Sequence, residues 1–473
     1  MSTRQPLVVA HDSAAIGYVS YDVTEAGVSY VLGHHVEEAE DDGPGISHPE
    51  AGGIPAGLSS APVCAISWSS RHATTLLLVL IELAERGVRT VVVDAATEPE
   101  QRFPEPQTPD ITVLRLPDSA FASEGGPPFR QRSGLPDGPT ATVGPHKVLL
   151  GRLARLVSCI LVRSAGCTQP SWATALNAER WLDGVLAQLR PGALLCGNDT
   201  SPLGVLTVAA AERAGAETVY VQHGAWIDSQ VGWRAQHCRH IAVMGARDVL
   251  TAHTWTRRAD ARTHIVGQPR FDALANSDRV QQREYLRGLL ADQANAEPPR
   301  IAVWACQPLS EQRLVGQFDV LVEGLRSTNH RWGLVIAPHP AQSPAAFTAL
   351  LDSAKGVDVA LATTEVGARG CLAGADTLIS ASSTCGIEAL LLDVPVLELA
   401  LPATRTLELA EHRAAQRCGT AVEIAIALAR VDRTPHAVRV PDAAKDSICR
   451  WDGRSAGAVA DIVLKAIAEH TAS

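Results

Sequence analysis

Short apolar runs rich in β-branched residues alternate along the chain with longer amphipathic segments. TTLLLVLIELAERGV (74–88) has the apolar spacing of a helix and ends at a glycine, and the strand-like RTVVVDA (89–95) follows it directly. Strands alternating with helices predict βαβ units and a parallel sheet. In the first part of the chain we expect strands at 6–12, 28–34, 63–69, 89–95, 193–198, 218–223, 240–245 and 263–268.

A second series of strands follows a polar helical segment that runs into Glu-Pro-Pro near residue 299. These strands are expected at 300–307, 332–340, 357–362, 375–382 and 394–400, with helices at 314–328 and 383–393. We therefore predict an α/β chain with two Rossmann-like parallel-sheet domains. The N-terminal domain covers 1–278, a linker 279–299, and the C-terminal domain 300–450, and a final helix at 451–473 packs back on the first domain.

Two stretches of the first domain do not fit this alternation. Residues 37–62 are acidic and then rich in glycine, and residues 98–146 contain many proline and glycine residues. Both are interpreted as surface insertions of the N-terminal domain.

Composition and charge narrow the classes of partner. The chain has 473 residues and a net charge of −10, so a nucleic-acid-binding role is not expected. Its ten cysteines show no CxxC spacing, which favours reduced thiols.

Neither a signal peptide nor an apolar run of about 20 residues is present, so we expect a cytoplasmic protein. The segment 146–163 mixes apolar and basic residues and would allow peripheral membrane association, although an ordinary surface helix is favoured. The oligomeric state is left open.

Candidate chemistry lies where strands end, because ligands of parallel α/β sheets bind beyond the carboxyl ends of the strands. The strand at 193–198 ends at Asn198 and leads into Asp199, and these residues either cap the next helix or, in the case of Asp199, deprotonate an acceptor hydroxyl. The strand TVYVQHG ends at His223 and Gly224. We interpret His223 as a catalytic histidine in the cleft between the domains, and Gly224 as a site of close backbone approach by a ligand.

The C-terminal domain contains the expected donor site. In APHP, two prolines restrain the backbone around His339, which suits phosphate binding. The strand at 375–382 leads into a hydroxyl-rich helix start, where free N–H groups and side-chain hydroxyls would bind a diphosphate, and a carboxylate one turn later would hold a ribose diol. The residues concerned are Ser382, Ser383, Thr384, Gly386 and Glu388. A capping box is less favoured, because Glu388 follows Thr384 by four residues rather than three.

Arg270, in VGQPRFD, would reach an anion across the cleft or pair with Asp272.

The chain contains no GxxxxGK[ST], HExxH or GxSxG motif, and no DxD pair at a strand end. We therefore expect no metal and no bound cofactor, so that histidine, hydroxyls and the helix start neutralise the leaving phosphate.

The succession QHG, VGQPRFD, APHP and SSTCGIEAL followed by DVPV resembles the GT-B glycosyltransferase superfamily. Within it, the chain looks most like the CDP-glycerol glycerophosphotransferase, polysialyltransferase and capsular Kdo-transferase-like group. The resemblance covers residues 195–400, whereas residues 1–190 share only the architecture. It implies the GT-B fold, in which two Rossmann-like domains face each other across a cleft.

The resemblance also implies a function. Such an enzyme moves a glycosyl or glycerophosphate-type group from a CDP-, CMP- or UDP-linked donor to an acceptor hydroxyl, in the synthesis of cell-surface polysaccharides or glycosylated metabolites. His339 and the hydroxyls of 382–384 would bind the donor phosphates, Glu388 the ribose, and His223 would face the acceptor. A UDP-N-acetylglucosamine 2-epimerase is the nearest alternative, although its N-terminal Gly-Thr-Arg-Pro-Glu signature is absent. A catalytically degenerate binding protein is the second alternative.

Overall fold

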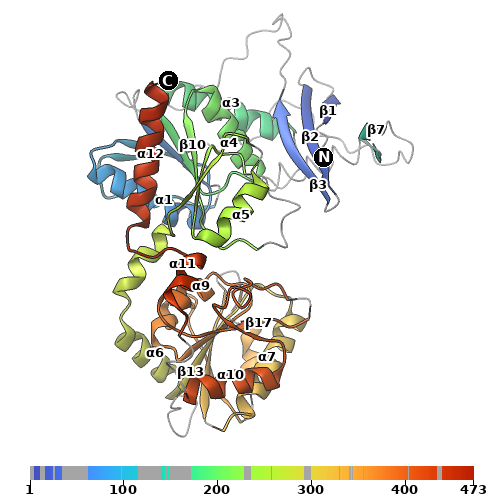
Figure 1. Ribbon diagram of the computed structural model, residues 1–473, viewed down its shortest axis with the longest axis vertical. Helices are drawn as coiled ribbons and strands as arrows, with labels where there is room; N and C mark the ends of the chain where they lie inside the picture. The colour runs from blue at the N-terminus through green and yellow to red at the C-terminus, as the bar shows by residue number, and fades with distance from the viewer. Residues whose placement is uncertain are drawn as a thin grey trace, which may run out of the picture.

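The computed structural model contains two parallel β-sheets that lie one above the other in Figure 1, each covered by helices on both faces. The structure describes residues 5–10, 16–24, 27–34, 62–96, 98–115, 140–143, 146–149, 172–227, 236–256, 258–291, 300–329, 331–339, 342–343, 345–354, 356–402, 404–433 and 439–472. The predicted α/β class with two Rossmann-like units is confirmed.

The first sheet has seven parallel strands in the order β12-β11-β10-β9-β4-β5-β6. These strands are β4 (Val63–Ser67), β5 (Thr90–Asp94), β6 (Ile111–Arg115), β9 (Ala193–Cys196), β10 (Glu217–Val221), β11 (His240–Val243) and β12 (Arg262–Ile265). The helices of this unit are α1 (Ser70–Glu85), α3 (Trp172–Leu189), α4 (Pro202–Arg213) and α5 (Ala246–Trp255), with 3₁₀ helices η1 (Pro99–Gln101) and η4 (Pro269–Asn276).

The second sheet has six parallel strands in the order β15-β14-β13-β16-β17-β18. They are β13 (Arg300–Ala305), β14 (Trp332–Ala337), β15 (Asp358–Leu361), β16 (Thr377–Ser380), β17 (Val396–Leu399) and β18 (Gln416–Cys418). The helices here are α6 (Arg279–Ala291), α7 (Glu311–Arg326), α8 (Ala345–Ser353), α9 (Cys385–Leu391), α10 (Ala421–Arg433) and α11 (Asp442–Ile448), with the 3₁₀ helix η5 (Arg369–Gly374). Helix α6 packs on η5 and on strands β14 and β15, so this segment belongs structurally to the second unit.

Both faces of each sheet are buried, as a parallel sheet requires. In β4, Val63 and Ala65 pack in one apolar cluster, whereas Cys64 and Ile66 pack in another on the opposite face. This alternation follows from the two-residue period of a strand, and it explains why the strands read as continuous apolar runs.

The C-terminal helix α12 (Ser455–Ala472) returns to the first unit and packs against α1, as Figure 1 shows for the red helix. The preceding chain passes so close to two glycines that a Cβ on Gly245 or Gly267 would lie 2.4 Å or 2.3 Å from a backbone carbonyl oxygen. Gly267 also has a φ of +86°, a conformation that side chains disfavour. Asp272 then accepts hydrogen bonds from the Ser455 hydroxyl (2.7 Å) and the Ala456 N–H (3.1 Å), and so holds the start of α12.

Three predictions about the N-terminal part need correction. The expected strands 6–12 and 28–34 do not join the parallel sheet, because β1 (Gln5–Ala10), β2 (Ile16–Thr24) and β3 (Gly27–His34) form a separate antiparallel sheet. Only two residues separate β2 from β3, and a parallel pairing would need a crossover of a dozen or more. The stretch 98–146, interpreted as an insertion, includes the edge strand β6 and a hairpin of β7 (Thr140–Val143) with β8 (His146–Leu149). Residues 37–61 and 150–163 lie outside the described part of the chain.

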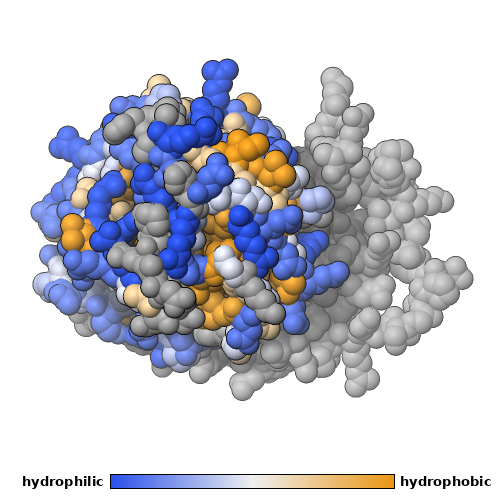
Figure 2. Space-filling view, turned by 90° about the horizontal axis from the view of Figure 1, so that it is seen from below, coloured by the Kyte–Doolittle hydropathy of each residue, from blue (hydrophilic) through white to orange (hydrophobic). Residues whose placement is uncertain are grey.

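Figure 2 looks at the lower end of the molecule, where hydrophilic residues surround smaller apolar areas. In the described ranges, none of the helices combines the length and the hydrophobicity needed to cross a membrane.

A histidine pair on the neighbouring strands β11 and β12 predicts a pH-dependent stability. His240 Nδ1 and His264 Nε2 lie 3.1 Å apart and their rings stack. Burial, reinforced by His240 and Arg262, lowers the pKa of His264 to about 4, and burial also lowers the pKa of His240. The charged groups around the pair are Glu217, Arg239, Arg262, Lys465, Glu469 and His470, from β10, the β10–β11 connection, β12 and α12.

Because the unfolded chain protonates His264 near pH 6.5 and the folded chain only near pH 4, the folded state loses stability as the pH falls across this window. Each such histidine contributes a slope of up to about 1.4 kcal/mol per pH unit. We expect His264→Gln to flatten the decline of the free energy of unfolding between pH 6.5 and 4.5, measured by urea denaturation. Equal slopes in variant and parent would contradict this assignment.

Candidate active site

The carboxyl ends of both sheets face each other, and each sheet changes its strand order at one point, between β9 and β4 and between β13 and β16. Such a point opens a crevice between the loops that leave in opposite directions. In the first unit the chain after β4 carries Arg71 and His72, at the start of α1, and the chain after β9 carries Gly197; in the second unit the chain after β16 carries residues 381–384.

His223 follows β10 and turns its ring toward the loop after β9. Its Nδ1 lies 2.5 Å from the carbonyl oxygen of Gly197, and since a carbonyl only accepts, Nδ1 carries the proton. In the neutral ring the lone pair is therefore on Nε2, the tautomer that a general base needs when its other nitrogen is held by an acceptor.

His72, in the first turn of α1, packs against His223 with ring centroids 4.9 Å apart and the rings nearly perpendicular. It is only 4% exposed and also packs edge-on against Trp68. Burial lowers the pKa of His72 well below its usual range, with His223 and Arg71 adding to the effect, so that this ring is neutral at pH 7. A Cβ on Gly197 would lie 3.1 Å from the His72 ring, so Gly197 leaves room for it.

Asn198 and Asp199 act on the backbone beside this site. The Asn198 Oδ1 accepts from the N–H groups of Thr200 (3.0 Å) and Ser201 (2.9 Å), and the Ser201 hydroxyl caps α4. Asp199 is fully buried, and its Oδ2 accepts from the N–H groups of His237 and Cys238 at 2.7 Å and 2.9 Å. Burial raises the pKa of Asp199 to about 6. This geometry favours a structural role for Asp199 over the expected proton acceptor, because the carboxylate does not reach the cleft.

Hydrogen bonds near His223 and His339 join the two units across the cleft. Arg71 Nη2 lies 3.2 Å from His339 Nε2, and the N–H of Ala225 donates to the Thr384 hydroxyl at 3.4 Å. Burial and the adjacent Arg71 lower the pKa of His339, so the imidazole is the acceptor of this pair and the positive charge is that of Arg71. The loop after His223 and the loop before α9 are thereby brought together.

The hydroxyl-rich loop before α9 is held by hydrogen bonds of its own side chains. The Ser380 hydroxyl accepts from the Ser383 N–H and the Ser383 hydroxyl from the Cys385 N–H, both at 3.3 Å, so these side chains support the loop itself. Ser382 is half-buried beside them. Helix α9 has only seven residues, so its dipole is small.

The two predicted glycines have different surroundings. A Cβ on Gly386 would meet Leu409 at 3.2 Å, so this glycine serves the packing of α9 against the loop around residue 409 rather than a ligand. Gly224 does not have a left-handed backbone, and a Cβ there would meet only the Thr384 hydroxyl, at 4.0 Å. The space around Gly224 is therefore open rather than closed by the backbone.

Glu388 lies between two arginines at the base of the cleft. It is 2% exposed, and its Oε2 lies 2.8 Å from Arg369 Nε. Burial raises the pKa of Glu388, whereas the charges of Arg369 and Arg270 oppose this rise. Arg369 Nη2 also donates to the carbonyl oxygen of Arg270 at 2.5 Å.

Arg270 itself is partly buried among like charges. Burial lowers the pKa of Arg270, Glu388 opposes this effect, and Arg369 and Arg71 add to it. Asp272, the alternative partner expected from the sequence, is engaged with the start of α12 instead. Three guanidinium groups thus converge here, and among the residues that the structure describes the one carboxylate that acts on Arg270 is Glu388.

Sequence reasoning missed Arg71, His72 and Arg369. The first two follow the strand 63–69 and stand in the first turn of a helix, so the strand-end rule that selected His223 applies to them as well. Arg369 lies in a 3₁₀ helix away from any strand end, and nothing in its local pattern indicates a site. Within the described residues, no three His, Cys, Asp or Glu side chains converge so as to hold a metal ion.

No protein-family model and no curated protein sequence matches the chain. Solved structures with a similar fold include UDP-GlcNAc 2-epimerase from Methanocaldococcus jannaschii, at a TM-score of 0.51 and 11% identity over 85% of this chain and 99% of that one. A glycosyltransferase from Rickettsia africae gives 0.51 and 9% identity over 86% and 98%, and MnaA of S. aureus in complex with UDP gives 0.51 and 10% identity over 86% and 96%. The two facing parallel sheets and these neighbours together show that the chain has the GT-B fold.

Proposed function

We propose that the protein is a transferase that moves a glycosyl or glycerophosphate-type group from a nucleotide-activated donor to an acceptor hydroxyl. The observation that carries the proposal is the convergence of Arg71, Arg270 and Arg369 in the cleft that also contains His223. Three cations balanced by one carboxylate favour a dianionic ligand, and arginine binds phosphate oxygens with paired hydrogen bonds.

The donor phosphates would lie between Arg71 and the two arginines beside Glu388. Glu388 would accept hydrogen bonds from the ribose hydroxyls, in the manner of other carboxylates that bind ribose in Rossmann-like domains. His223 would take the proton of the acceptor hydroxyl on Nε2 while the oxygen attacks the activated carbon or phosphorus. The bond to the nucleotide phosphate then breaks, and the arginines stabilise the leaving anion.

A UDP-GlcNAc 2-epimerase activity is the second candidate, because an epimerase of this kind is among the structures that share the fold. The same arginines would hold the nucleotide, but the sugar would be rearranged without an acceptor. Product analysis separates the two, since an epimerase converts UDP-GlcNAc alone and a transferase needs the hydroxyl compound. Synthesis of a cell-surface polysaccharide is the setting that the resemblance suggests for a transferase.

Nucleotide binding is the first measurement that tests the proposal. We expect one or more of CDP, CMP, UDP, GDP and dTDP to raise the melting temperature, because a ligand that binds only the folded state stabilises it. Arg369→Ala removes one of the three cations and is expected to weaken binding at least tenfold. Arg331→Ala, on the surface beside β15, provides the matched control. If no nucleotide raises the melting temperature of the parent protein, the donor site is wrongly assigned.

A further inference from the structure

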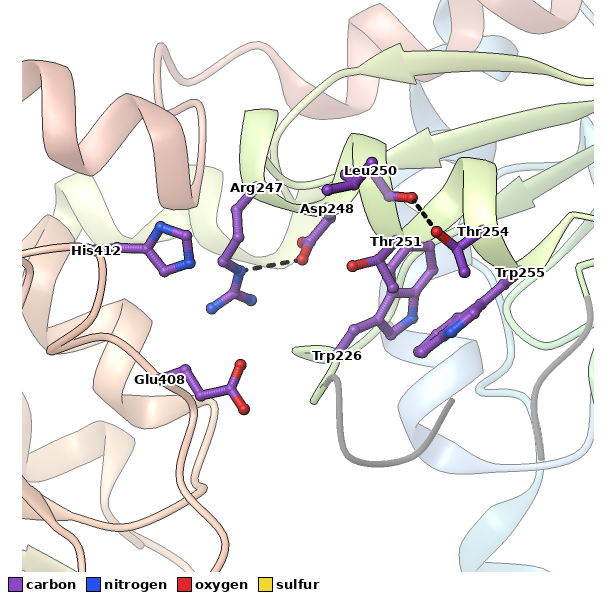
Figure 3. Close-up of a pocket in the computed structure, with 9 residues that line it drawn as sticks. All are labelled: Trp226, Arg247, Asp248, Leu250, Thr251, Thr254, Trp255, Glu408 and His412. Atoms are coloured by element: carbon purple, nitrogen blue, oxygen red, sulfur yellow. Dashed lines mark hydrogen bonds and ion pairs between the residues drawn. The ribbon is translucent and has the colours of Figure 1, made fainter. Parts of the chain in front are cut away.

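A second pocket opens on the α5 side of the interface between the units, with a volume of about 340 Å³ (Figure 3). Its walls come from α5, from the loop after His223 and from the loop after β17. The residues that line it are Trp226, Arg247, Asp248, Leu250, Thr251, Thr254, Trp255, Glu408 and His412. The donor site described above uses none of them.

Arg247 has a buried hydrogen-bond donor that a ligand in this pocket could satisfy. It is 9% exposed, and its guanidinium group points into the space between His412 and Glu408 in Figure 3. Nε donates to Asp248 at 3.1 Å and Nη1 to the carbonyl oxygen of Leu407 at 3.0 Å, but the buried Nη2 has no hydrogen-bond partner. A buried donor without an acceptor is costly, so an oxygen atom of a bound molecule would be favourable here.

The charges that line the pocket determine whether a charged or a neutral ligand is favoured. Asp248, at 2% exposure, already neutralises Arg247, and Glu408 adds a negative charge at the rim. A phosphate or carboxylate would therefore bring its negative charge close to two carboxylates, Asp248 and Glu408. Neutral hydroxyl groups avoid this repulsion, because they accept from Nη2 and donate to the carboxylate.

The remaining walls suit a ring with one apolar side. Trp226 and Trp255 lie 4.9 Å apart between ring centroids and contribute apolar wall, while Thr251 and Thr254 contribute hydroxyls. Trp226 stands three residues after His223, and Gln222 donates to Asp248 at 2.9 Å. The loop that carries the candidate base is thus joined to the wall of this pocket.

Resting on the proposed function, we propose that this pocket binds a neutral sugar ring or polyol, with Arg247 and Glu408 as the residues that select it. The sugar belongs either to the acceptor or to the transferred group of the donor. In both cases its hydroxyls fill the pocket while the nucleotide phosphates bind to the arginines of the proposed donor site.

Binding of small sugars to the full chain tests this proposal. We expect methyl glucoside, methyl N-acetylglucosaminide or glycerol to give saturation-transfer NMR signals at millimolar concentration in the presence of UDP, and glucuronate to bind at least tenfold more weakly than methyl glucoside. Arg247→Lys keeps a cation beside Asp248 but loses the forked donors, so it should weaken sugar binding at least tenfold. Arg258→Lys, whose guanidinium group pairs with Asp260 on the surface, is the matched control and should bind as the parent does.

Competition experiments identify the source of the sugar, and their outcomes separate a failure of this inference from a failure of the proposed function. If intact UDP-GlcNAc displaces the methyl glycoside and UDP does not, the pocket holds the sugar of the donor; if both ligands bind together, it holds the acceptor. UDP binding without binding of any of the neutral compounds would overturn this inference and leave the proposed function intact. Tighter binding of glucuronate would also overturn it, whereas failure of every nucleotide in the melting-temperature screen would instead remove the proposed function.

Discussion

His223→Ala is expected to lower kcat by a factor of about 10² to 10⁴, the usual contribution of a positioned general base, while nucleotide affinity stays within about twofold of the parent. The physical reason is that the candidate base and the expected phosphate ligands are different residues. His223 is fixed by the Gly197 carbonyl oxygen, whereas Arg369, a proposed phosphate ligand, pairs with Glu388. The measurement is steady-state turnover with the nucleotide sugar and acceptor that binding identifies, together with calorimetric titration of the nucleotide.

The control and the rescue distinguish proton transfer from a structural role. His253→Ala removes an exposed histidine of α5 and should leave kcat unchanged. Added imidazole should restore part of the turnover of His223→Ala, because a small base can enter the space left by the side chain. Equal loss of nucleotide affinity and turnover, without rescue, would show that His223 holds the two units together rather than accepting a proton.

Much of the sheet architecture can be predicted from the sequence, for a physical reason. A strand of a parallel sheet is buried on both faces, so β4, β5, β13 and β14 appear as continuous apolar runs that end abruptly at polar residues. The strand-end rule then finds His223 and His339 directly, because both follow such runs. The antiparallel strands before residue 35 also have apolar character, but the pattern of one strand does not reveal which neighbour it pairs with.

The contacts within the site are harder to predict from the sequence, because they join residues that are far apart in the chain. Arg71 and His339 are separated by 268 positions, and Arg369 reaches Arg270 across 99. No local period encodes such pairs. The burial of Asp199 illustrates the reverse error: its place after a strand indicates a site, but its carboxylate turns inward to the N–H groups of 237 and 238.

Glu388→Gln is expected to abolish most of the preference for ribonucleotides over 2′-deoxyribonucleotides. A hydrogen bond to a charged group contributes about 1.5–3 kcal/mol, which corresponds to a preference of about 10- to 100-fold in the parent. Glutamine keeps the volume of a side chain that is 2% exposed, so the packing of α9 is retained while the charge is lost. Calorimetric titration of the tightest nucleotide and its 2′-deoxy form, in both proteins, gives the coupling free energy directly.

The two roles open to Glu388 predict different results in this cycle. If the carboxylate holds the ribose, the variant loses affinity for the ribonucleotide and the 2′-deoxy form binds both proteins almost equally. If Glu388 only neutralises Arg270 and Arg369, its removal leaves two cations facing the phosphates, and both nucleotides bind the variant more tightly by a similar factor. Glu423→Gln, on the exposed face of α10, should change neither constant. An unchanged preference in Glu388→Gln would therefore assign the carboxylate to charge balance and place the ribose elsewhere in the cleft.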